Sequence, residues 1–456
     1  MKMKFKSKVL LLLLMGSTTV VPSYALTTST TSKDLIEVYQ EAINNSPLLK
    51  SQEATMSATS EIVGVSLGEA LPNVAVVGSL SVTNADSGGG AAGNVSGSFK
   101  TGSLNLVLNQ QIFNYAVFTG YQYSRQVAAQ AGAAYQGQQQ SFILQVAEAY
   151  FNILLAEDNV SFSEANLKSS KSTLDRTQLM FNNGMSTDAD VKQAEATFYT
   201  AQATLIQDKN TLKVNHYDLY SLTGVLQESF APLRDNVSYV DPTPNDVSSW
   251  IALAKKHNYD LIAQRYATEA NYSLVGVANS LFLPSLSLTA SYTIANNVGN
   301  DAIIAATGIT PNHTRSGYVG LNLTWNIFNG GTDFATKIQA AKNYEAQQYT
   351  TIDATRSLEQ TTSNDFNNVI SFVNQVQALT QSVKASKLSY EQFLEQYKVG
   401  TATVTDVLDQ QKLLFQAMTN LASAKYSYII AVLQLKYDAG TISVQDINHF
   451  NGWLKG

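Results

Sequence analysis

The feature that most limits how this chain can fold is an internal duplication. Three landmarks occur in the same order in each half, at offsets of 212, 215 and 216 residues: Leu71-Pro72 and Leu283-Pro284, Ile112-Phe113-Asn114 and Ile327-Phe328-Asn329, and Gly184 with Asp190-Val191 and Gly400 with Asp406-Val407. Ordered landmarks at a nearly constant offset indicate two tandem copies of one structural unit. We place the first repeat at 26–224, a proline-containing linker at 225–246, the second repeat at 247–440 and a C-terminal tail at 441–456.

Each repeat begins with two predicted strands. We expect strands at about 71–84 and 98–113 in the first repeat and at about 283–296 and 316–328 in the second, where apolar residues alternate with Ser, Thr and Asn. An ordinary soluble antiparallel sheet shows the same alternation. The polar faces carry almost no charge, which favours a membrane barrel with a water-filled interior. Four strands cannot close such a barrel, so several chains would have to share one.

Long helices are predicted after each strand pair. The ranges of about 115–182 and 332–398 contain no proline and almost no glycine, and at ~1.5 Å per residue each forms a rod of roughly 100 Å. A second helix follows each rod, at about 186–223 and 402–439. Apolar residues recur every seven positions along these second helices: Val191, Phe198, Leu205, Leu212 and Leu219, then Val407, Leu414, Leu421, Tyr428 and Leu435. Such a stripe predicts a coiled-coil seam, although a soluble helical bundle explains it equally well.

The first residues predict export. Four lysines among the first eight residues, the apolar run Val9–Met15 and the small residues of Ser23-Tyr24-Ala25 form a signal peptide over 1–25. No later run reaches the ~18 uninterrupted apolar residues of a membrane helix, so membrane residence would depend on the strands. The stretch from Leu26 to Ser32 and the tail from Val444 to Gly456 carry no recognised chemistry, and we expect both to be mobile.

Composition excludes several function classes. The chain has no cysteine, which excludes disulfides and thiolate metal sites. Its net charge of -6, with no basic cluster beyond the four lysines at its start, argues against nucleic-acid binding. The four histidines are scattered: His216, His257, His313 and His449. Neither a metal-binding HExxH motif nor a phosphate-binding loop is present. We therefore predict no catalytic residue, no metal and no cofactor, and we do not expect an enzyme.

The ordered set of motifs resembles the TolC-like outer-membrane efflux proteins. The resemblance covers essentially the whole mature chain, and it depends on the Leu-Pro and Ile-Phe-Asn landmarks, on Val146-Ala-Glu-Ala-Tyr-Phe-Asn152, and most of all on the segment from Tyr397 to Asp409 with its counterpart from Phe181 to Val191. It implies an α+β membrane protein: a homotrimer whose chains each give four strands to one twelve-stranded outer-membrane β-barrel, surrounded by lipid, and continue it with a long periplasmic α-helical coiled-coil barrel.

The resemblance also implies a function. The expected molecule is a passive exit duct of a tripartite efflux or type I secretion system, which takes drugs, small toxic compounds or secreted proteins from a periplasmic adaptor (membrane fusion) protein and an inner-membrane transporter to the outside. The alternative from another class is an exported filament-forming or surface-layer protein with helical hairpins.

A periplasmic gate is expected at Asp406, Asp409, Asp190 and Tyr397. Asp406 and Asp409 are three residues apart, so they share a helix face, and around a threefold axis they would form a ring of six carboxylates. In the resembling family the matching positions line the tip constriction; a simple helix-capping role for Asp406 is the alternative. Tyr397 and Asp190 match positions that hydrogen-bond between neighbouring helices.

One position departs from the family pattern. Ala402 stands where the family has an Arg of the same latch, with Lys398 or Lys192 as candidate substitutes. Gly184 and Gly400 end the long rods, where a left-handed residue lets the chain reverse. The resemblance adds adaptor docking at these two turns.

Overall fold

The computed structural model describes residues 28–29, 32–87, 95–234, 236–299 and 312–455; the predicted signal peptide lies outside them. The helices are α1 (Leu35–Asn45), α2 (Pro47–Ser60), α3 (Ile62–Ala70), α4 (Tyr115–Asn182), α5 (Asp188–Thr223), α6 (Val247–His257), α7 (Tyr259–Ser280), α9 (Thr332–Lys398), α10 (Val404–Asp438) and α11 (Val444–Asn451). The strands are β1 (Thr28–Ser29), β2 (Asn73–Ser87), β3 (Val95–Phe113), β4 (Leu226–Gln227), β5 (Ser285–Gly299) and β6 (Asn312–Thr324).

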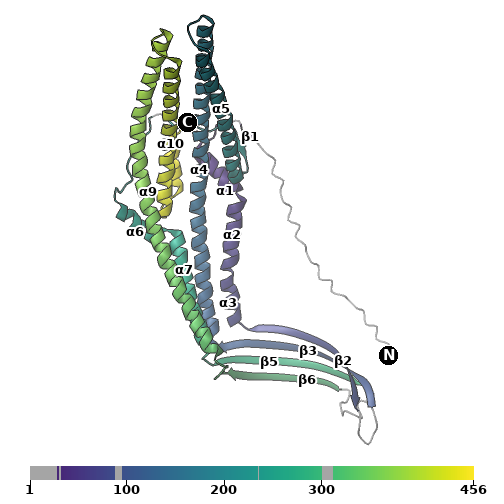
Figure 1. Ribbon diagram of the computed structural model, residues 1–456. Helices are drawn as coiled ribbons and strands as arrows, with labels where there is room; N and C mark the ends of the chain where they lie inside the picture. Colours follow the sequence, from purple (N-terminus) through teal and green to yellow (C-terminus); the bar gives the residue numbers. More distant parts are fainter. Residues whose placement is uncertain (1–27, 30–31, 88–94, 235, 300–311, 456) are drawn as a thin grey trace.

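The molecule is elongated, with a helical end and a sheet end (Figure 1). The rods α4 and α9 both run along the helical part, with α7 and α10 packed between them, and each reverses in a tight turn into α5 or α10 at the end farthest from the sheet. Both repeats therefore present their helical turns at one tip. None of the described helices is long and apolar enough to cross a membrane.

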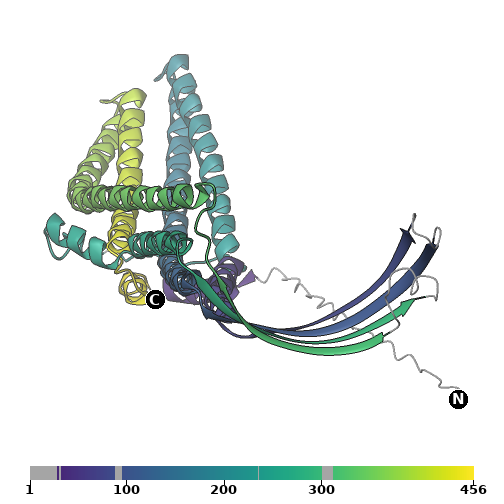
Figure 2. The same cartoon turned by 90° about the horizontal axis from the view of Figure 1, so that it is seen from below.

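The four long strands form one antiparallel sheet in the order β2-β3-β5-β6, which curves strongly along its length (Figure 2). One face carries most of the exposed apolar side chains, among them Leu80, Val319 and Leu321, although Val77 of the opposite face is also exposed. The other face is polar and hydrogen-bonded across strands: Thr293 Oγ1 donates to Asn105 Oδ1 at 3.0 Å. The alternation expected from the sequence thus sorts apolar and polar residues to opposite faces.

The last strand ends earlier than predicted. We expected a strand over 316–328, but β6 spans Asn312–Thr324. The reason is a missing partner: Thr324 pairs with Ser285, the first residue of β5, so the following residues have no β5 residue to pair with. The second helices α5 and α10 also begin later than expected, because Thr187 and Thr403 serve as their N-caps.

The main core lies in the middle of the helical part. Tyr150 and Phe151 of α4 are fully buried there, and the Tyr150 hydroxyl donates to the carbonyl of Ala231 in the linker at 3.0 Å. The coiled-coil stripe faces inward, as Val407 and Leu435 of α10 and Leu219 of α5 are all buried. Apolar side chains at heptad spacing thus bring the second helices against the rods.

The expectation of a mobile tail is wrong. Residues 444–451 form α11, and Ile447 and Phe450 of this helix are buried in the core. Asn451 fixes the helix to α1, since its Oδ1 accepts from the Ile36 backbone N–H at 3.2 Å and its Nδ2 donates to Asp34 at 2.9 Å. The spacing of apolar residues over two helical turns was too short a signal to reveal this packing.

Candidate functional site

The tip of the molecule is built from two turns with the same backbone geometry. Gly184 and Gly400 follow the ends of the rods with φ angles of 73° and 79°, in the left-handed region that glycine adopts without strain. The next residue after each glycine donates its N–H back to the helix, from Met185 to Met180 at 2.8 Å and from Thr401 to Gln396 at 2.9 Å. This is a Schellman end, which satisfies carbonyls that a helix terminus leaves free.

Each turn then starts a new helix with a reciprocal capping box. Thr187 accepts from the backbone N–H of Asp190 at 3.2 Å, and the Asp190 carboxylate accepts from the Thr187 N–H at 3.0 Å. Thr403 and Asp406 repeat the arrangement at 3.2 and 2.9 Å. The spacing Gly-x-x-Thr-x-x-Asp therefore stops one helix and begins the next within seven residues.

The capping bonds keep both carboxyl groups ionised. The backbone N–H and the hydroxyl of Thr187 lower the pKa of Asp190, and the hydroxyl and backbone N–H of Thr403 lower the pKa of Asp406. Hydrogen bonds to the charged form favour that form. Asp406 thus has the capping role that was the alternative to a gate role, and its carboxylate still carries a charge at the tip.

Asp409 lies one turn further along α10 and is exposed. It lines a groove of about 530 Å³ between α4, α5 and α10, together with Gln193, Gln411 and Lys412. The structure therefore brings Asp406 and Asp409 to one stretch of α10, one capping the helix and the other facing the groove.

Tyr397 is buried close to the turn, with only 4% of its surface exposed. Its hydroxyl is hydrogen-bonded to Thr177 Oγ1 of α4 at 2.8 Å, and its ring packs in an apolar cluster with Val404, Val407 and Ala194. Within the described chain the Tyr397 hydroxyl bonds to Thr177 and not to Asp190, whose carboxylate accepts from Ser186 and Thr187. Tyr397 instead joins the two helical hairpins to each other.

The departure at Ala402 leaves a small side chain packed against this same cluster. The two lysines considered as substitutes for the family's Arg form local ion pairs. Lys398 Nζ lies 2.5 Å from Glu395, and Lys192 Nζ lies 2.9 Å from Glu195. Both pairs are on the lysine's own helix, so within the chain neither lysine bridges the two hairpins.

Further polar bonds between the hairpins were missed by sequence reasoning. Gln411 of α10 is almost fully buried, and its amide donates to Asn166 Oδ1 at 2.6 Å and to Ser170 Oγ at 2.8 Å on α4. Nearer the tip, Thr405 Oγ1 donates to Gln193 Oε1 at 3.0 Å. No short motif marks these residues, because their partners lie more than 200 positions away in the sequence.

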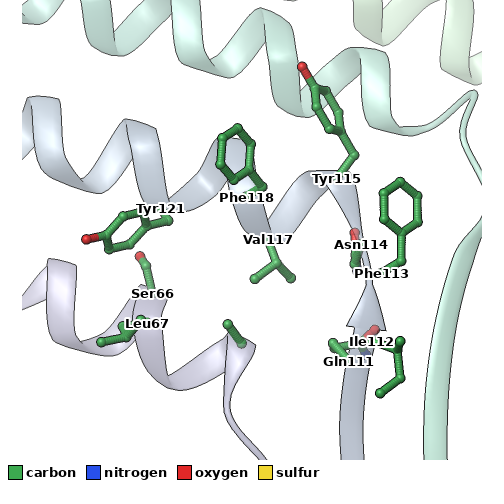
Figure 3. Close-up of a pocket in the computed structure, with 11 residues that line it drawn as sticks. Ser66, Leu67, Gln111, Ile112, Phe113, Asn114, Tyr115, Val117, Phe118 and Tyr121 are labelled. Carbon is green, nitrogen blue, oxygen red and sulfur yellow. The ribbon is translucent and has the colours of Figure 1, made fainter.

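A second cavity lies at the opposite end of the rods, where the sheet meets the helices (Figure 3). It has a volume of about 380 Å³ and is lined mainly by apolar side chains of α3, the end of β3 and the start of α4, including Leu67, Ile112 and Phe118. Its lining offers Ser66, Gln111 and Asn114 as polar groups. Within the described residues, no group of three or more His, Asp or Glu side chains is placed to hold a metal ion.

The duplicated sequence and the fold match known proteins. The family model described as "Outer membrane efflux protein" matches residues 38–225 and 250–441, which is most of the chain and both repeats. The chain belongs to the outer membrane efflux protein family.

Individual relatives of this efflux protein agree with that assignment. It is 29% identical to the outer membrane protein TolC of Vibrio cholerae over 94% of this chain and 96% of the relative. It is 26% identical to the alkaline protease secretion protein AprF of Pseudomonas aeruginosa, over 75% of this chain and 70% of the relative. The Campylobacter jejuni CmeC outer membrane channel superposes with a TM-score of 0.75 at 20% identity, covering 95% and 94% of the two chains, which shows the shared fold.

Family membership decides between the two functions that the sequence left open, an export duct and a structural surface protein. The efflux protein is an outer membrane channel for efflux or secretion, with four strands per chain and a helical part that extends into the periplasm. It is a transport protein and not an enzyme. The alternative of a filament-forming or surface-layer protein is wrong.

Proposed function

We propose that three copies of this efflux protein form one duct, in which twelve strands close a barrel and the helices of all three copies surround a periplasmic tunnel. One observation carries the proposal: the four-stranded sheet is strongly curved and ends in two strands, β2 and β6, that each pair on one side only within the described chain. Unpaired backbone groups cannot face lipid, so both edges need a partner strand. A ring of identical chains provides one for every edge.

The tip of the duct is the proposed gate. Asp406 and Asp409 from three copies place six carboxylates around one axis, and such a ring attracts cations strongly. Tyr397 holds the second turn, which carries these carboxylates, through Thr177 and the buried cluster. Asp190 holds the neighbouring first turn through its cap on α5. Opening requires the α9–α10 hairpin to move away from the α4–α5 hairpin, which breaks the bonds between them.

The same tip is the proposed docking point for a periplasmic adaptor protein, which connects the duct to an inner-membrane transporter. Gly184 and Gly400 keep the two turns narrow, and adding a Cβ atom at either glycine would meet no neighbouring atom. Exposed apolar side chains flank them, namely Met185 and Val399, which are 66% and 75% exposed. Val399 and Gly400 also line an open groove of about 750 Å³ between α4 and the end of α9.

Both proposed cargo classes, small toxic compounds or drugs and secreted proteins, have counterparts among the relatives. One relative is an outer membrane efflux protein of Brucella suis, whereas the Pseudomonas aeruginosa and Dickeya chrysanthemi relatives are protease secretion proteins. A deletion strain tests the two classes separately. We expect increased sensitivity to drugs if the duct serves efflux, and loss of specific proteins from the culture medium if it serves secretion.

The gate is tested by single-channel recording in planar bilayers. A multivalent cation added on the periplasmic side should block the purified duct, and we expect Asp406→Ala with Asp409→Ala to weaken the block by about tenfold or more, because the carboxylate ring is removed. Asp353→Ala, which removes an exposed carboxylate from the middle of α9, is the matched control and should leave the block unchanged. Unchanged block in the double variant contradicts the proposed gate.

A further inference from the structure

The two free edges of the sheet are similar in length. β2 has 15 residues and β6 has 13, and both run along the full height of the sheet. If the duct is a closed ring of three copies, as proposed above, β6 of one copy pairs with β2 of the next. The pairing within the chain then limits how these two edges can meet.

Residues paired directly across strands form a line that can be followed through the whole sheet. Ser79 of β2 pairs with Ser103 of β3, Ser103 pairs with Ala295 of β5, and Ala295 pairs with Thr314 of β6. From Thr314 the line continues into β2 of the next copy. The residue at which it enters depends on the register between β6 and that β2. The distance along β2 between Ser79 and that residue is the stagger contributed by one copy.

Full overlap of the two edges leaves three registers. Every residue of β6 faces a residue of β2 only when Asn312 lies opposite position 85, 86 or 87 of the next copy, which places Thr324 opposite position 73, 74 or 75. A stagger in the opposite direction is excluded, because a line from Thr314 to position 75 would leave only five residues of β6 paired. The lengths of the edges therefore set the direction of the stagger.

The alternation of the two faces removes one of these three registers. Residues directly opposite each other in an antiparallel pair lie on the same face of the sheet. The apolar face contains Val319 of β6 and Leu80 of β2, whereas Ser79 lies on the polar face, hydrogen-bonded to Ser103. The register with Asn312 opposite position 86 places Val319 opposite Ser79 and mixes the faces, so it is excluded.

We propose that β6 pairs with β2 of a second copy of this chain in one of the two remaining registers, with Leu321 opposite either Val76 or Gly78. The line from Ser79 then enters the next copy at Thr83 or at Ala85, a stagger of four or six residues. With twelve strands, these staggers correspond to strand tilts of about 35° or about 45°, the two ends of the range observed for membrane barrels. Edge length, face alternation and barrel geometry thus agree on the same two interfaces.

Cysteine cross-linking tests the register, and the chain contains no native cysteine to interfere. Four double variants combine Leu321→Cys with Val74→Cys, Val76→Cys, Gly78→Cys or Leu80→Cys. Directly opposite residues are 4.5–5.5 Å apart between Cα atoms, within disulfide range, whereas diagonal neighbours are about 7–8 Å apart. After oxidation of the purified duct, we expect a shift from monomer to disulfide-linked trimer on non-reducing gels for Val76→Cys or Gly78→Cys, and not for the other two.

Two controls and a second series sharpen the result. Leu321→Cys with Leu288→Cys joins a pair within the chain and should form a disulfide without linking copies. Leu321→Cys with Val77→Cys places the second thiol on the polar face and should not link copies. Because cysteine at Gly78 can disturb the strand, the series is repeated with Leu323→Cys, for which the expected partner moves to Val74 or Val76.

Trimer mass in detergent and pore conductance are measured on every variant, so that failure of the register is separated from failure of the duct. Conducting trimers that link through Val74 or Leu80 in the Leu321 series, through Val77, or through none of these positions overturn the proposed register and leave the duct intact. Protein that is monomeric and forms no pores overturns the trimeric duct, and the register with it.

Discussion

The two turns at the tip have the same backbone but different side chains. Both use glycine, threonine and aspartate at the same spacing, and their hydrogen bonds agree in pattern. At the position of Tyr397, which is 4% exposed, the first repeat has Phe181, which is 39% exposed. At the position of the exposed Asp409 it has Gln193, which accepts a hydrogen bond from Thr405 of the second repeat.

The comparison distinguishes the residues that form the turn from those that contact the other hairpin or add a charge. The first turn is self-contained, since Ser186 adds a third hydrogen bond to Asp190 at 3.0 Å. The second turn has Ala402 at the position of Ser186, so its carboxylate depends on Thr403 alone within the described chain. We conclude that the duplication preserved the backbone of both turns, whereas the buried aromatic contact of Tyr397 and the carboxylate of Asp409 belong to the second turn alone. The first turn carries a different second carboxylate, Asp188.

The largest effect is expected from Tyr397→Ala. Removing a buried aromatic ring and its bond to Thr177 leaves a cavity in the tip cluster and should cost about 3 kcal/mol of local stability. Phe181→Ala is the matched control and should cost less, about 1 kcal/mol, because Phe181 is 39% exposed whereas Tyr397 is 4% exposed. Hydrogen exchange of the backbone amides at the end of α9 and the start of α10 measures the Tyr397 variant, and exchange at the end of α4 and the start of α5 measures the Phe181 variant. Equal effects of the two variants would contradict the asymmetry of the turns.

Tyr397→Phe separates the ring from its hydroxyl. The ring still fills the cluster, so only the hydrogen bond to Thr177 is lost, and about 1 kcal/mol is expected. If Tyr397 is part of the gate, this variant should also open more often in planar bilayers than the unaltered duct. Faster exchange without a change in opening would limit Tyr397 to a structural role.

Replacing Gly184 or Gly400 should cost the same stability, in contrast to the unequal costs expected for Tyr397 and Phe181. Gly184→Ala and Gly400→Ala each force a side chain into the left-handed region and should cost about 1–2 kcal/mol. Neither added methyl group meets another atom, so the cost is the same at both positions. Gly→Asn at either position should cost less, because asparagine adopts this conformation more readily. Hydrogen exchange of the same turns measures the four variants, and a clear difference between Gly184→Ala and Gly400→Ala would show that packing also constrains one of the turns.

Much of the fold could be predicted because its signals are local or repeated. Long stretches without proline and glycine indicate the rods, alternation indicates the strands, and Gly184 and Gly400 indicate the reversals. Strand ends were harder, since the end of β6 depends on where β5 begins, 39 residues earlier in the chain. The helix α11 was not predicted from the sequence. Its two buried apolar residues, Ile447 and Phe450, are too few to form a recognisable pattern, and their burial depends on packing against the main core.

The candidate site was less predictable, for a physical reason. Glycine and aspartate act on the backbone next to them, so their roles at the turns follow from spacing. The partner of Tyr397 is decided by the packing of α4 against α9, and it is Thr177 within the chain. Gln411 was not singled out for the same reason: its two partners lie on another helix, and their distance in sequence exceeds 200 residues.

The smallest effect concerns pH and follows from the capping carboxylates. The pKa values of Asp190 and Asp406 are lowered in the folded turns by bonds from Thr187 and Thr403. A carboxyl group with a lowered folded pKa stabilises the fold above its ordinary value of 3.8, and this contribution is lost as the pH falls through the folded pKa. Both turns should therefore keep their structure at neutral pH and loosen only below about pH 4.

Spin labels on single cysteines at Met185 and Val399, both exposed, report the mobility of the two turns during such a titration. The second turn should loosen at a higher pH than the first. Asp190 accepts an additional hydrogen bond from Ser186, whereas Asp406 has no such bond because the matching residue is Ala402. Ala402→Ser supplies the missing hydroxyl and should move the second transition toward the first, whereas Ser186→Ala should move the first toward the second. If neither exchange shifts its transition, the hydroxyl at this position does not account for the difference between the turns, and the contacts of Tyr397 become the remaining cause.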